Sequence, residues 1–316
     1  MMFSSLDPWL IMVYNAETTM LPPHIQTASD LQTPHQTICD GFLAQAIQKT
    51  KKAQVFVQEA QQLDALLQQA ASIEQLVSVP DIQKQLVAAA GISDKARKYF
   101  TPAGLENTVA EVLKVIADSN PYGWRAEIVY RFLLTRGDTL GGSMRNYIGA
   151  LGGAQLADAI VAALSGTGIT PIVVMASRNP VKVVSLEWPG RLLVFDKKPK
   201  FIDKNIDAIL LDKDKMTSAG TVSLEQPGAY VACGELKGGI DPGGADEHWK
   251  TAGTAFTRLR AVLHSETPHL FFVAAAIEMA MAVEIYKQLQ DGRLEYAANL
   301  TVPHQVADLA DWLVSL

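Results

Sequence analysis

The sequence predicts an α/β protein in which a mixed sheet is flanked by helices and accompanied by a mainly helical N-terminal region. Two observations carry this prediction. Between about residues 37 and 120, apolar side chains recur three and four positions apart, which is the period of amphipathic helices. From residue 169 onward, short apolar runs are separated by Pro, Gly or charged residues, which is typical of strands. We therefore expect a helical region over residues 1–120 and an α/β core over residues 121–316.

The composition is that of a globular protein, and it excludes two other classes. Of the 316 residues, 48% are hydrophobic and 19% are charged, so the chain can form a core and is not a disordered polymer. The formal net charge of −6 excludes a uniformly basic surface, so binding to nucleic acid would need a local basic patch. The two cysteines, Cys39 and Cys233, lie far apart without metal-ligand spacing, and nothing requires an oxidising compartment.

The chain offers no clear targeting or membrane segment. The N-terminal run carries Asp7 and Pro8 and lacks a basic start, which makes it a poor signal peptide. No window reaches the roughly 18 to 20 uninterrupted apolar residues of a membrane span. We therefore expect a cytoplasmic protein.

The sequence of the N-terminal region predicts an arm followed by helices. Residues 1–35 are rich in Pro and Thr and predict a loose arm, whereas residues 37–90 have a helical period. Ser93 can cap a short basic helix, and residues 106–118 predict another helix that ends at a strong turn, SNPYGW.

In the core region, the sequence predicts helices followed along the chain by strands. Residues 125–136 and 143–164 predict helices, with a loop at RGDTLGG (136–142) between them. A further helix is expected over residues 246–262, and another in MAVEIYKQLQDG before a C-terminal tail. The expected strands are TPIVVMAS, VKVVSLEW, RLLVFD, DAILLD, AYVACGEL and LFFVAA.

A carboxylate–x–lysine triplet lies at residues 235–237, within AYVACGELKGGIDPGGADEHWK. In a strand, residues two apart point to the same side, so Glu235 and Lys237 share a face while Leu236 points to the core. The triplet ends an apolar strand and precedes two glycines, which leave room for a substrate backbone. A second triplet at residues 196–198 enters a lysine run and has no acidic strand shortly upstream, so the sequence favours the first.

An acidic strand precedes the favoured triplet. Asp203, Asp207 and Asp212 lie 32, 28 and 23 residues before Glu235. Spacing alone does not choose among them. We favour Asp207 because it starts a buried run, whereas Asp212 lies beside lysines in what reads as a solvated turn.

These residue types together favour phosphodiester hydrolysis. An aspartate and a glutamate on neighbouring strands can hold one hard cation through oxygen ligands, and Mg²⁺ suits such a pair best. The metal polarises a phosphodiester and lowers the pKa of a bound water. The Lys237 ammonium would stabilise negative charge on the phosphate oxygens. The alternative is a salt-bridged strand end at the surface.

The spacing of these residues resembles that of a known nuclease superfamily. Ile-Asp, 27 intervening residues and then Glu-Leu-Lys resembles the PD-(D/E)xK nucleases, with isoleucine in place of the proline. GELKGGIDPGGADEHWKTA further resembles type II restriction endonucleases of the AvaI/BsoBI family, in which a histidine follows the lysine by eleven residues, as His248 follows Lys237 here. RGDTLGGSMRN also resembles a segment shared by several type II restriction enzymes. The resemblance covers about residue 121 to the C-terminus.

The resemblance implies a PD-(D/E)xK restriction-endonuclease-like core over residues 121–316, with the helical region as a part that embraces or recognises DNA. It implies that Asp207 and Glu235 bind Mg²⁺ and that Lys237 assists the attack. His248 would be an additional catalytic residue, and a neutral imidazole has the chemistry of a general base near pH 7. Without the resemblance, an exposed helix residue would be the better interpretation of His248.

Basic residues near the triplet are candidates for DNA contact. Phosphate contacts give affinity and register, whereas base edges give sequence. Lys204 can donate to guanine and Asp241 can accept from a cytosine amino group, and both positions resemble base-contacting positions of the family. The main basic patch, for which a solvated turn is the alternative, consists of Lys197, Lys198, Lys200 and Lys204; a weaker one consists of Lys95, Arg97 and Lys98. A last group is expected to orient the core or touch phosphate, unless it belongs to a structural glycine loop: Arg136, Asp138, Arg145 and Asn146.

The family resemblance also implies partners and a type of site. It implies an Mg²⁺-dependent enzyme that cuts double-stranded DNA at a CYCGRG-type site to leave 5′ overhangs. It also implies a homodimer, because a DNA site with twofold symmetry is matched by a protein with twofold symmetry. A cognate DNA methyltransferase would act on the same site without stable binding. The alternatives are a repair or structure-selective nuclease with the same core, and a non-catalytic DNA- or protein-binding module.

Overall fold

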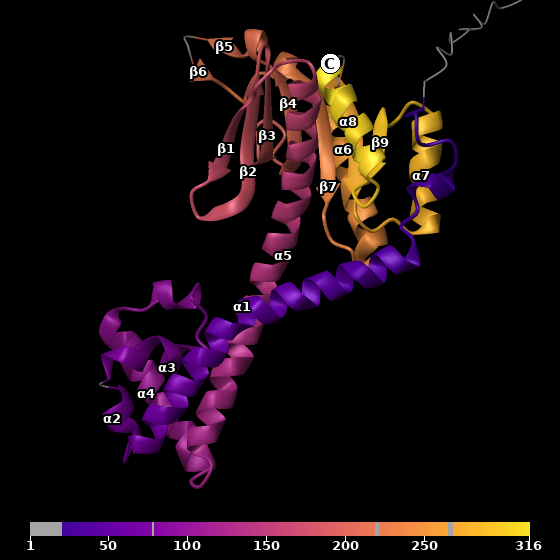
Figure 1. Cartoon of the computed structure of the whole chain (residues 1–316). Coiled ribbons are helices and arrows are strands. Elements are labelled where there is room, and N and C mark those ends of the chain that lie inside the picture. The colour runs from indigo at the N-terminus through magenta and orange to yellow at the C-terminus, as the bar shows by residue number, and fades with distance from the viewer. Residues whose placement is uncertain (1–20, 78, 219–220, 265–267) are drawn as a thin grey trace, which may run out of the picture. The chain divides into compact units, whose positions relative to one another are not determined.

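The computed structural model describes residues 21–77, 79–218, 221–264 and 268–316 (Figure 1). The expected absence of a signal peptide falls on residues 1–20, which lie outside the described residues. The chain divides into two compact units. The first, Met1–Pro34 with Leu151–Leu316, is called the sheet unit, and the second, His35–Ala150, the helical unit. The boundary expected at residue 120 falls inside the helical unit.

The helical unit is built from amphipathic helices around one apolar core. Ala60, Leu63 and Leu67 of the first helix are buried in this core with Leu113 and Ile116 of the fourth. The fourth helix begins at a capped proline, because the Thr101 side chain accepts from the Gly104 N–H at 3.1 Å. The helices are α1 (His35–Gln69), α2 (Ile73–Val77), α3 (Gln83–Ala89), α4 (Pro102–Ser119) and the start of α5 (Trp124–Gly166), with short 3₁₀ turns η2 (Pro80–Ile82) and η3 (Ala96–Tyr99).

The expected loop at RGDTLGG (136–142) is wrong, because α5 continues through it as one helix of 43 residues. Glycine in a helix interior costs about 1 kcal/mol, which is the reason the sequence favours a loop there. The apolar residues on both sides oppose this cost, since Phe132, Leu140 and Met144 are all buried. Packing of one continuous helix face therefore overrides the local preference of the glycines.

The sheet unit contains a mixed seven-stranded sheet with the order β1-β2-β3-β4-β7-β8-β9 (Figure 1). The pairs from β1 to β7 are antiparallel, and β7–β8 and β8–β9 are parallel. This confirms the expected mixed α/β core. The strands are β1 (Ile172–Ala176), β2 (Asn179–Trp188), β3 (Arg191–Lys197), β4 (Ile206–Asp212), β7 (Tyr230–Lys237), β8 (His269–Ala274) and β9 (Tyr296–Asn299), with β5 (Thr217–Ser218) and β6 (Thr221–Val222) in a separate ribbon.

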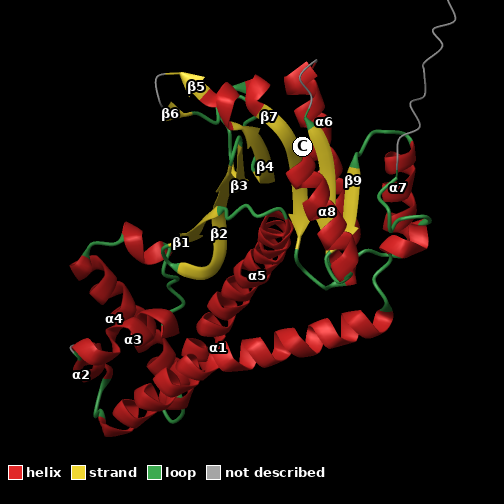
Figure 2. Cartoon of the chain, turned by 45° about the horizontal axis from the view of Figure 1, so that its top comes forward, coloured by secondary structure: helices red, strands yellow, loops and turns green. Residues whose placement is uncertain are grey.

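Helices cover both faces of the sheet (Figure 2). One face is covered by the C-terminal part of α5 and by α8 (Pro303–Ser315), through residues such as Ile160 and Leu309. The other is covered by α6 (Ala245–Leu263) and α7 (Met279–Gln290), through residues such as Phe256 and Ile285. Short 3₁₀ turns complete the unit: η1 (Ala28–Leu31), η4 (Lys213–Met216), η5 (Pro227–Ala229) and η6 (Pro242–Gly244).

The C-terminal tail expected from the sequence is instead β9 followed by α8. The strand is hard to recognise because its four residues are all buried and show no alternation.

The loose arm expected over residues 1–35 is wrong for residues 21–34, which pack onto the sheet unit. Ile25 and Leu31 are buried in its core. Thr33 donates from Oγ1 to the Ala275 carbonyl at 2.9 Å, and the Asn299 Nδ2 donates to Thr33 Oγ1 at 2.9 Å. These buried hydrogen bonds join the segment to the ends of β8 and β9.

Among the described helices, only α5 is long and apolar enough to cross a membrane, by length and composition alone. Within its most apolar stretch, 28% of the residues are buried. A single helix of this kind is weak evidence for a membrane span, since core helices of soluble proteins meet the same criteria.

Gly234→Ala is expected to destabilise the sheet unit. A Cβ built at Gly234 would lie 2.2 Å from the Phe271 ring on β8, which is fully buried and has no free direction in which to move. Overpacking of this kind costs about 1–3 kcal/mol, measurable by urea unfolding. The control is Gly253→Ala in α6, where an added Cβ meets no atom within 4 Å. This substitution should raise the free energy of unfolding by about 0.5–1 kcal/mol, because alanine favours a helix more than glycine does. Equal effects of the two substitutions would contradict this account.

Candidate active site

Two neighbouring antiparallel strands bring Asp207 and Glu235 to the same place. Ala208 of β4 pairs with Gly234 of β7, so one further step along the register sets Asp207 opposite Glu235. Residues opposite each other in an antiparallel pair point to the same face of the sheet. The carboxylates therefore approach one another although they lie 28 residues apart in the sequence.

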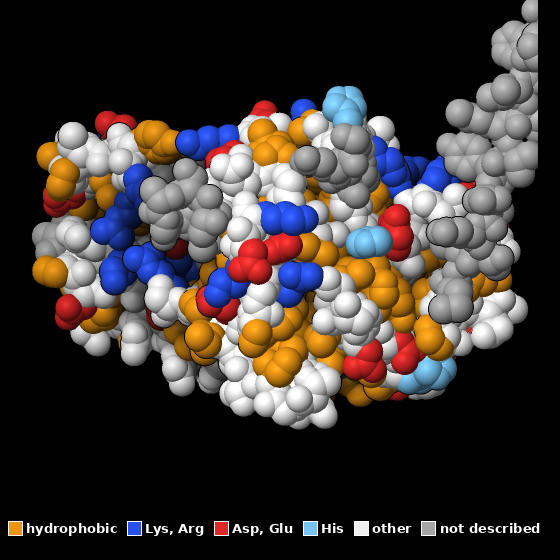
Figure 3. All heavy atoms as spheres, turned by 90° about the horizontal axis from the view of Figure 1, so that it is seen from above, with side chains coloured by type: hydrophobic (Ala, Val, Ile, Leu, Met, Phe, Trp, Pro, Cys, Tyr) orange, Lys and Arg blue, Asp and Glu red, His pale blue; other side chains and the backbone are white. Residues whose placement is uncertain are grey.

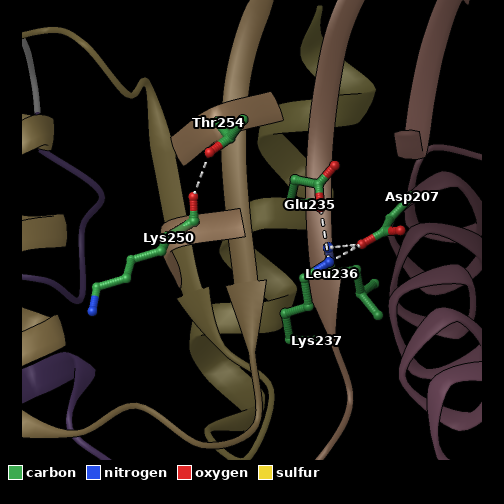
Figure 4. A network of polar contacts seen from close by, with 6 residues as sticks. All are labelled: Asp207, Glu235, Leu236, Lys237, Lys250 and Thr254. Carbon is green, nitrogen blue, oxygen red and sulfur yellow. Dashed lines mark hydrogen bonds and ion pairs between the residues drawn. The ribbon is translucent and has the colours of Figure 1, made fainter. Parts of the chain in front are cut away.

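The Lys237 ammonium joins the two carboxylates (Figure 4). Its Nζ donates to Asp207 Oδ2 at 2.6 Å and to Glu235 Oε2 at 2.8 Å. The backbone N–H of Leu236 donates to the same Asp207 oxygen at 2.9 Å. All three side chains are thereby fixed by direct hydrogen bonds within β4 and β7.

Burial gives this cluster unusual electrostatics. Glu235 is 4% exposed, and its burial, with the nearby Asp207 carboxylate, raises its pKa to about 7 in spite of the Lys237 ammonium. Burial alone would lower the pKa of Lys237, but the two carboxylates outweigh it and raise that pKa above its usual value. Lys237 therefore stays charged near neutral pH, while Glu235 takes up and releases a proton there.

Glycines allow close packing around the carboxylates. Gly234 precedes Glu235 and faces the Phe271 ring, where no side chain fits. On α5, a Cβ at Gly152 would lie 2.9 Å from Leu236 Cδ2 and 3.1 Å from the Gly238 Cα. The end of β7 is thus held between a helix and the neighbouring strand, which limits the movement of Glu235 and Lys237.

The structure separates Asp207 from the other candidate aspartates. Asp203 pairs with Lys198 at 2.7 Å, and Asp212 lies 3.8 Å from Lys215 and 3.9 Å from Arg191. In the second triplet, Asp196 pairs with Lys182 at 2.7 Å. Among the described residues, only Asp207 shares a cation with Glu235.

His248 lies in the first turn of α6, and its side chain is exposed. It makes no hydrogen bond or ion pair with any described residue, so the structure does not bring it into contact with Asp207, Glu235 or Lys237. Asp241 is also exposed, and its carboxylate accepts from the Gly243 N–H at 2.9 Å as the cap of η6. Both residues belong to the loop and helix start that follow β7.

The two carboxylates fit a single hard cation. The described residues contain no group of three His, Cys, Asp or Glu side chains that could hold a metal ion. Magnesium, however, is commonly bound by one or two carboxylates and keeps several waters. The Lys237 ammonium already lies between Asp207 and Glu235, which shows that the pair accommodates positive charge.

In the main basic patch, one lysine side chain pairs with a carboxylate and the backbone of another is bonded to one. Lys198 pairs with Asp203, and the backbone N–H of Lys200 donates to the Glu225 carboxylate at 3.1 Å. Lys197 and Lys204 are half-buried without a carboxylate partner among the described residues. In the helical unit, Lys95, Arg97 and Lys98 are exposed on or beside η3. Figure 3 shows Lys and Arg side chains in several separate groups on one face, with Asp and Glu side chains among them.

Arg136 has a structural place in the helical unit. It is 13% exposed and lies 3.8 Å from Glu59 and 3.6 Å from Asp94. Its guanidinium also lies 5.6 Å from the centre of the Phe132 ring. Arg136 is therefore held within the helical unit, and the glycine loop offered as the alternative is wrong because α5 is continuous there. Asp138, Arg145 and Asn146 are exposed on the same helix.

Sequence reasoning missed three contributors to the site's surroundings. The Leu236 N–H is a backbone group and leaves no signal in the sequence. Glu225 accepts a hydrogen bond from the backbone N–H of Lys200, which lies 25 residues before it, and so holds the segment after β3 in place. The Trp249 Nε1 donates to Glu284 Oε2 at 2.7 Å and joins α6 to α7. Each of these contacts depends on tertiary proximity rather than on spacing.

Comparisons with known proteins match almost the whole chain to one family of restriction enzymes. The family model described as restriction endonuclease BsobI matches residues 22–179 and 181–316. The chain is 38% identical over 311 residues to the type II restriction enzyme AvaI of Nostoc sp. and to that of Anabaena variabilis, covering 93% of this chain and 98% of each relative. It is 35% identical over 315 residues to the type II restriction enzyme BsoBI of Geobacillus stearothermophilus, covering 93% of this chain and 97% of the relative.

Glu235 is expected to make stability fall as pH rises. The folded protein holds a proton at Glu235 up to about pH 7, whereas the unfolded chain releases it near the ordinary pKa of 4.5. Between these values the folded state binds more protons, so the free energy of unfolding decreases with pH, by roughly 3 kcal/mol in total. Glu235→Gln should remove this decrease in urea unfolding followed from pH 4.5 to 7.5 with EDTA present.

The control for this titration is Glu247→Gln on the exposed surface of α6, which should keep the wild-type pH dependence. If Glu235→Gln and the wild-type protein showed parallel pH dependences, the raised pKa would be contradicted.

Proposed function

The chain belongs to the restriction endonuclease BsobI family and is a type II site-specific deoxyribonuclease, and we propose that Asp207, Glu235 and Lys237 carry out its cleavage of DNA. One observation carries this proposal: the Lys237 ammonium bonds to both carboxylates at the adjoining ends of β4 and β7. The near-full-length similarity to restriction enzymes favours this function over a repair nuclease or a non-catalytic module.

The arrangement supports a PD-(D/E)xK core. Asp207 provides the first acidic position, and the Glu235-Leu236-Lys237 triplet ends the adjacent strand. Isoleucine precedes the aspartate, and this residue is buried in the core of the sheet unit. The position before the aspartate therefore needs an apolar side chain that packs, and proline is not required for the geometry.

We assign the chemical roles by charge and position. Asp207 and Glu235 would hold Mg²⁺, which supplies a polarised phosphodiester and a water of lowered pKa when bound. Lys237, which stays charged near neutral pH, would stabilise the negative charge that develops on the phosphate oxygens. His248 would accept a proton from the attacking water, a role that requires the α6 start to approach the carboxylates when DNA is bound.

DNA recognition is assigned to the residues around these strands. Lys204 lies three residues before Asp207 and Asp241 follows Lys237 by four, so both lie next to the proposed catalytic residues. They would contact base edges, whereas the phosphate contacts would come from Lys197, Lys198, Lys200 and Lys95. The proposed site is of the CYCGRG type, cut to leave 5′ overhangs.

Cleavage of both strands at a symmetric site calls for two copies of the active site. We therefore propose a homodimer acting on double-stranded DNA. Host DNA would be protected by a cognate methyltransferase that acts on the same sequence without stable binding to this chain. We propose a cytoplasmic location, in keeping with the soluble character of type II restriction enzymes.

Lys237→Ala is expected to lower the rate of DNA cleavage by at least 10³-fold, because it removes a buried cation at the reacting phosphate. The assay is incubation of phage DNA with Mg²⁺, followed by sequencing of the fragment ends. The wild-type protein should give discrete fragments whose ends all fit one degenerate pattern of the proposed CYCGRG type, and Ca²⁺ should support binding without cleavage. The matched control is Lys250→Ala, since Lys250 lies on α6 away from the carboxylates (Figure 4), and its exposed ammonium pairs with Asp246. A smear of fragments, or full activity of Lys237→Ala, would count against the proposal.

His248→Ala is expected to lower the cleavage rate by about 10²–10⁴-fold, the range for loss of a general base, while binding of the cognate duplex in Ca²⁺ changes little. Single-turnover cleavage rates in Mg²⁺, measured beside binding affinities in Ca²⁺, check this, because only the rate should fall in the variant. His264→Ala, at the end of α6, is the control. An unchanged single-turnover cleavage rate for His248→Ala would exclude the general-base role.

A further inference from the structure

Helix α1 carries an exposed stripe opposite the face that it buries. Its buried residues are Ala60, Leu63 and Leu67, which lie on one side of the helix. An α-helix turns about 100° per residue, so a second set of positions lies roughly 180° away from them. This set is called the α1 stripe and consists of Asp40, Leu43, Ala44, Ile47 and Lys51.

The stripe is apolar in the middle and charged at its two ends. Leu43 is 62% exposed and Ile47 is 47% exposed, and Ala44 beside them is also exposed. Asp40 accepts a hydrogen bond from Gln36 Nε2 at 2.9 Å but has no cationic partner among the described residues. Lys51 likewise has no carboxylate partner there. The stripe thus leaves both apolar surface and two opposite charges unmatched.

The stripe is complementary to itself when two copies run antiparallel. With a twofold axis between residues 45 and 46, Asp40 of one copy faces Lys51 of the other, and Ala44 faces Ile47. A small residue then receives a large one, and each charge meets its opposite. A parallel arrangement would instead set Asp40 against Asp40 and Lys51 against Lys51, which is repulsive.

We propose that the α1 stripe is an interface between two copies of this chain, with the two α1 helices packed antiparallel across a twofold axis. This inference rests on the proposed homodimer and locates one of its contacts. An isologous interface uses the same surface on both subunits, so that surface must be complementary to itself. The stripe meets this condition, because it has an acidic residue at one end, apolar residues in the middle and a basic residue at the other end. The apolar pair supplies affinity, while the exposed ion pairs fix register and direction, since such pairs add little energy themselves.

A charge swap tests the interface with the full-length protein. Asp40→Lys and Lys51→Asp each replace two attractive contacts of the dimer by two repulsive ones, and each should raise the dimer dissociation constant about tenfold or more. The double variant Asp40→Lys/Lys51→Asp restores opposite charges and should return the constant to within about threefold of wild type. Sedimentation velocity over a range of protein concentrations, without DNA, measures these constants.

Two further variants keep the test decisive. Asp64→Lys makes the same charge change at an exposed position of α1 away from the stripe and should leave the dissociation constant unchanged. Leu43→Asp should weaken the dimer at least tenfold, and circular dichroism checks that α1 remains folded. A wild-type dimer that none of the variants weakens, or that the charge swap fails to restore, would overturn the interface but not the proposed catalytic residues. A monomeric wild-type protein would overturn the homodimer as well.

Discussion

Two carboxylates and one ammonium lie together, largely shielded from solvent, where β4 and β7 adjoin. Like charges at this distance repel, and burial makes the charged form of each more costly. The Lys237 ammonium compensates by bonding to both Asp207 and Glu235 at once. The surrounding packing keeps the three groups together: Gly234 admits the Phe271 ring, and Gly152 admits the end of β7. This packing keeps the two carboxylates close together, as the proposed Mg²⁺ site requires.

The sheet was largely predictable, because its strands follow simple patterns. The run before Glu235 is apolar and ends in charge, and β7 occupies that run as expected. Two features were hidden from the sequence for different physical reasons. α5 continues through three glycines because buried residues on both sides keep the helix face intact, and β9 is too short to show a period. Residues 21–34 lack periodicity as well, yet buried hydrogen bonds from Thr33 and Asn299 hold them on the core.

The candidate site was predictable in part. Glu235 and Lys237 followed from the two-residue period of a strand, and Asp207 from its place at the start of a buried run. The register of β4 against β7 then decides among the three aspartates, since Asp203 and Asp212 are occupied by other cations. The Leu236 N–H could not be foreseen, because it is a backbone contact. His248 came from family resemblance, and its exposed position on α6 leaves its role to be tested with DNA bound.

Asp207 and Glu235, and not the neighbouring aspartates, are the proposed cation site. Calorimetric titration of Ca²⁺ into the protein bound to cognate duplex tests it most directly, comparing Asp207→Asn with Asp203→Asn and Asp212→Asn. We expect Asp207→Asn to weaken Ca²⁺ binding by at least tenfold and the other two substitutions to leave the affinity unchanged. Retained affinity in Asp207→Asn, or loss in Asp203→Asn or Asp212→Asn, would contradict it.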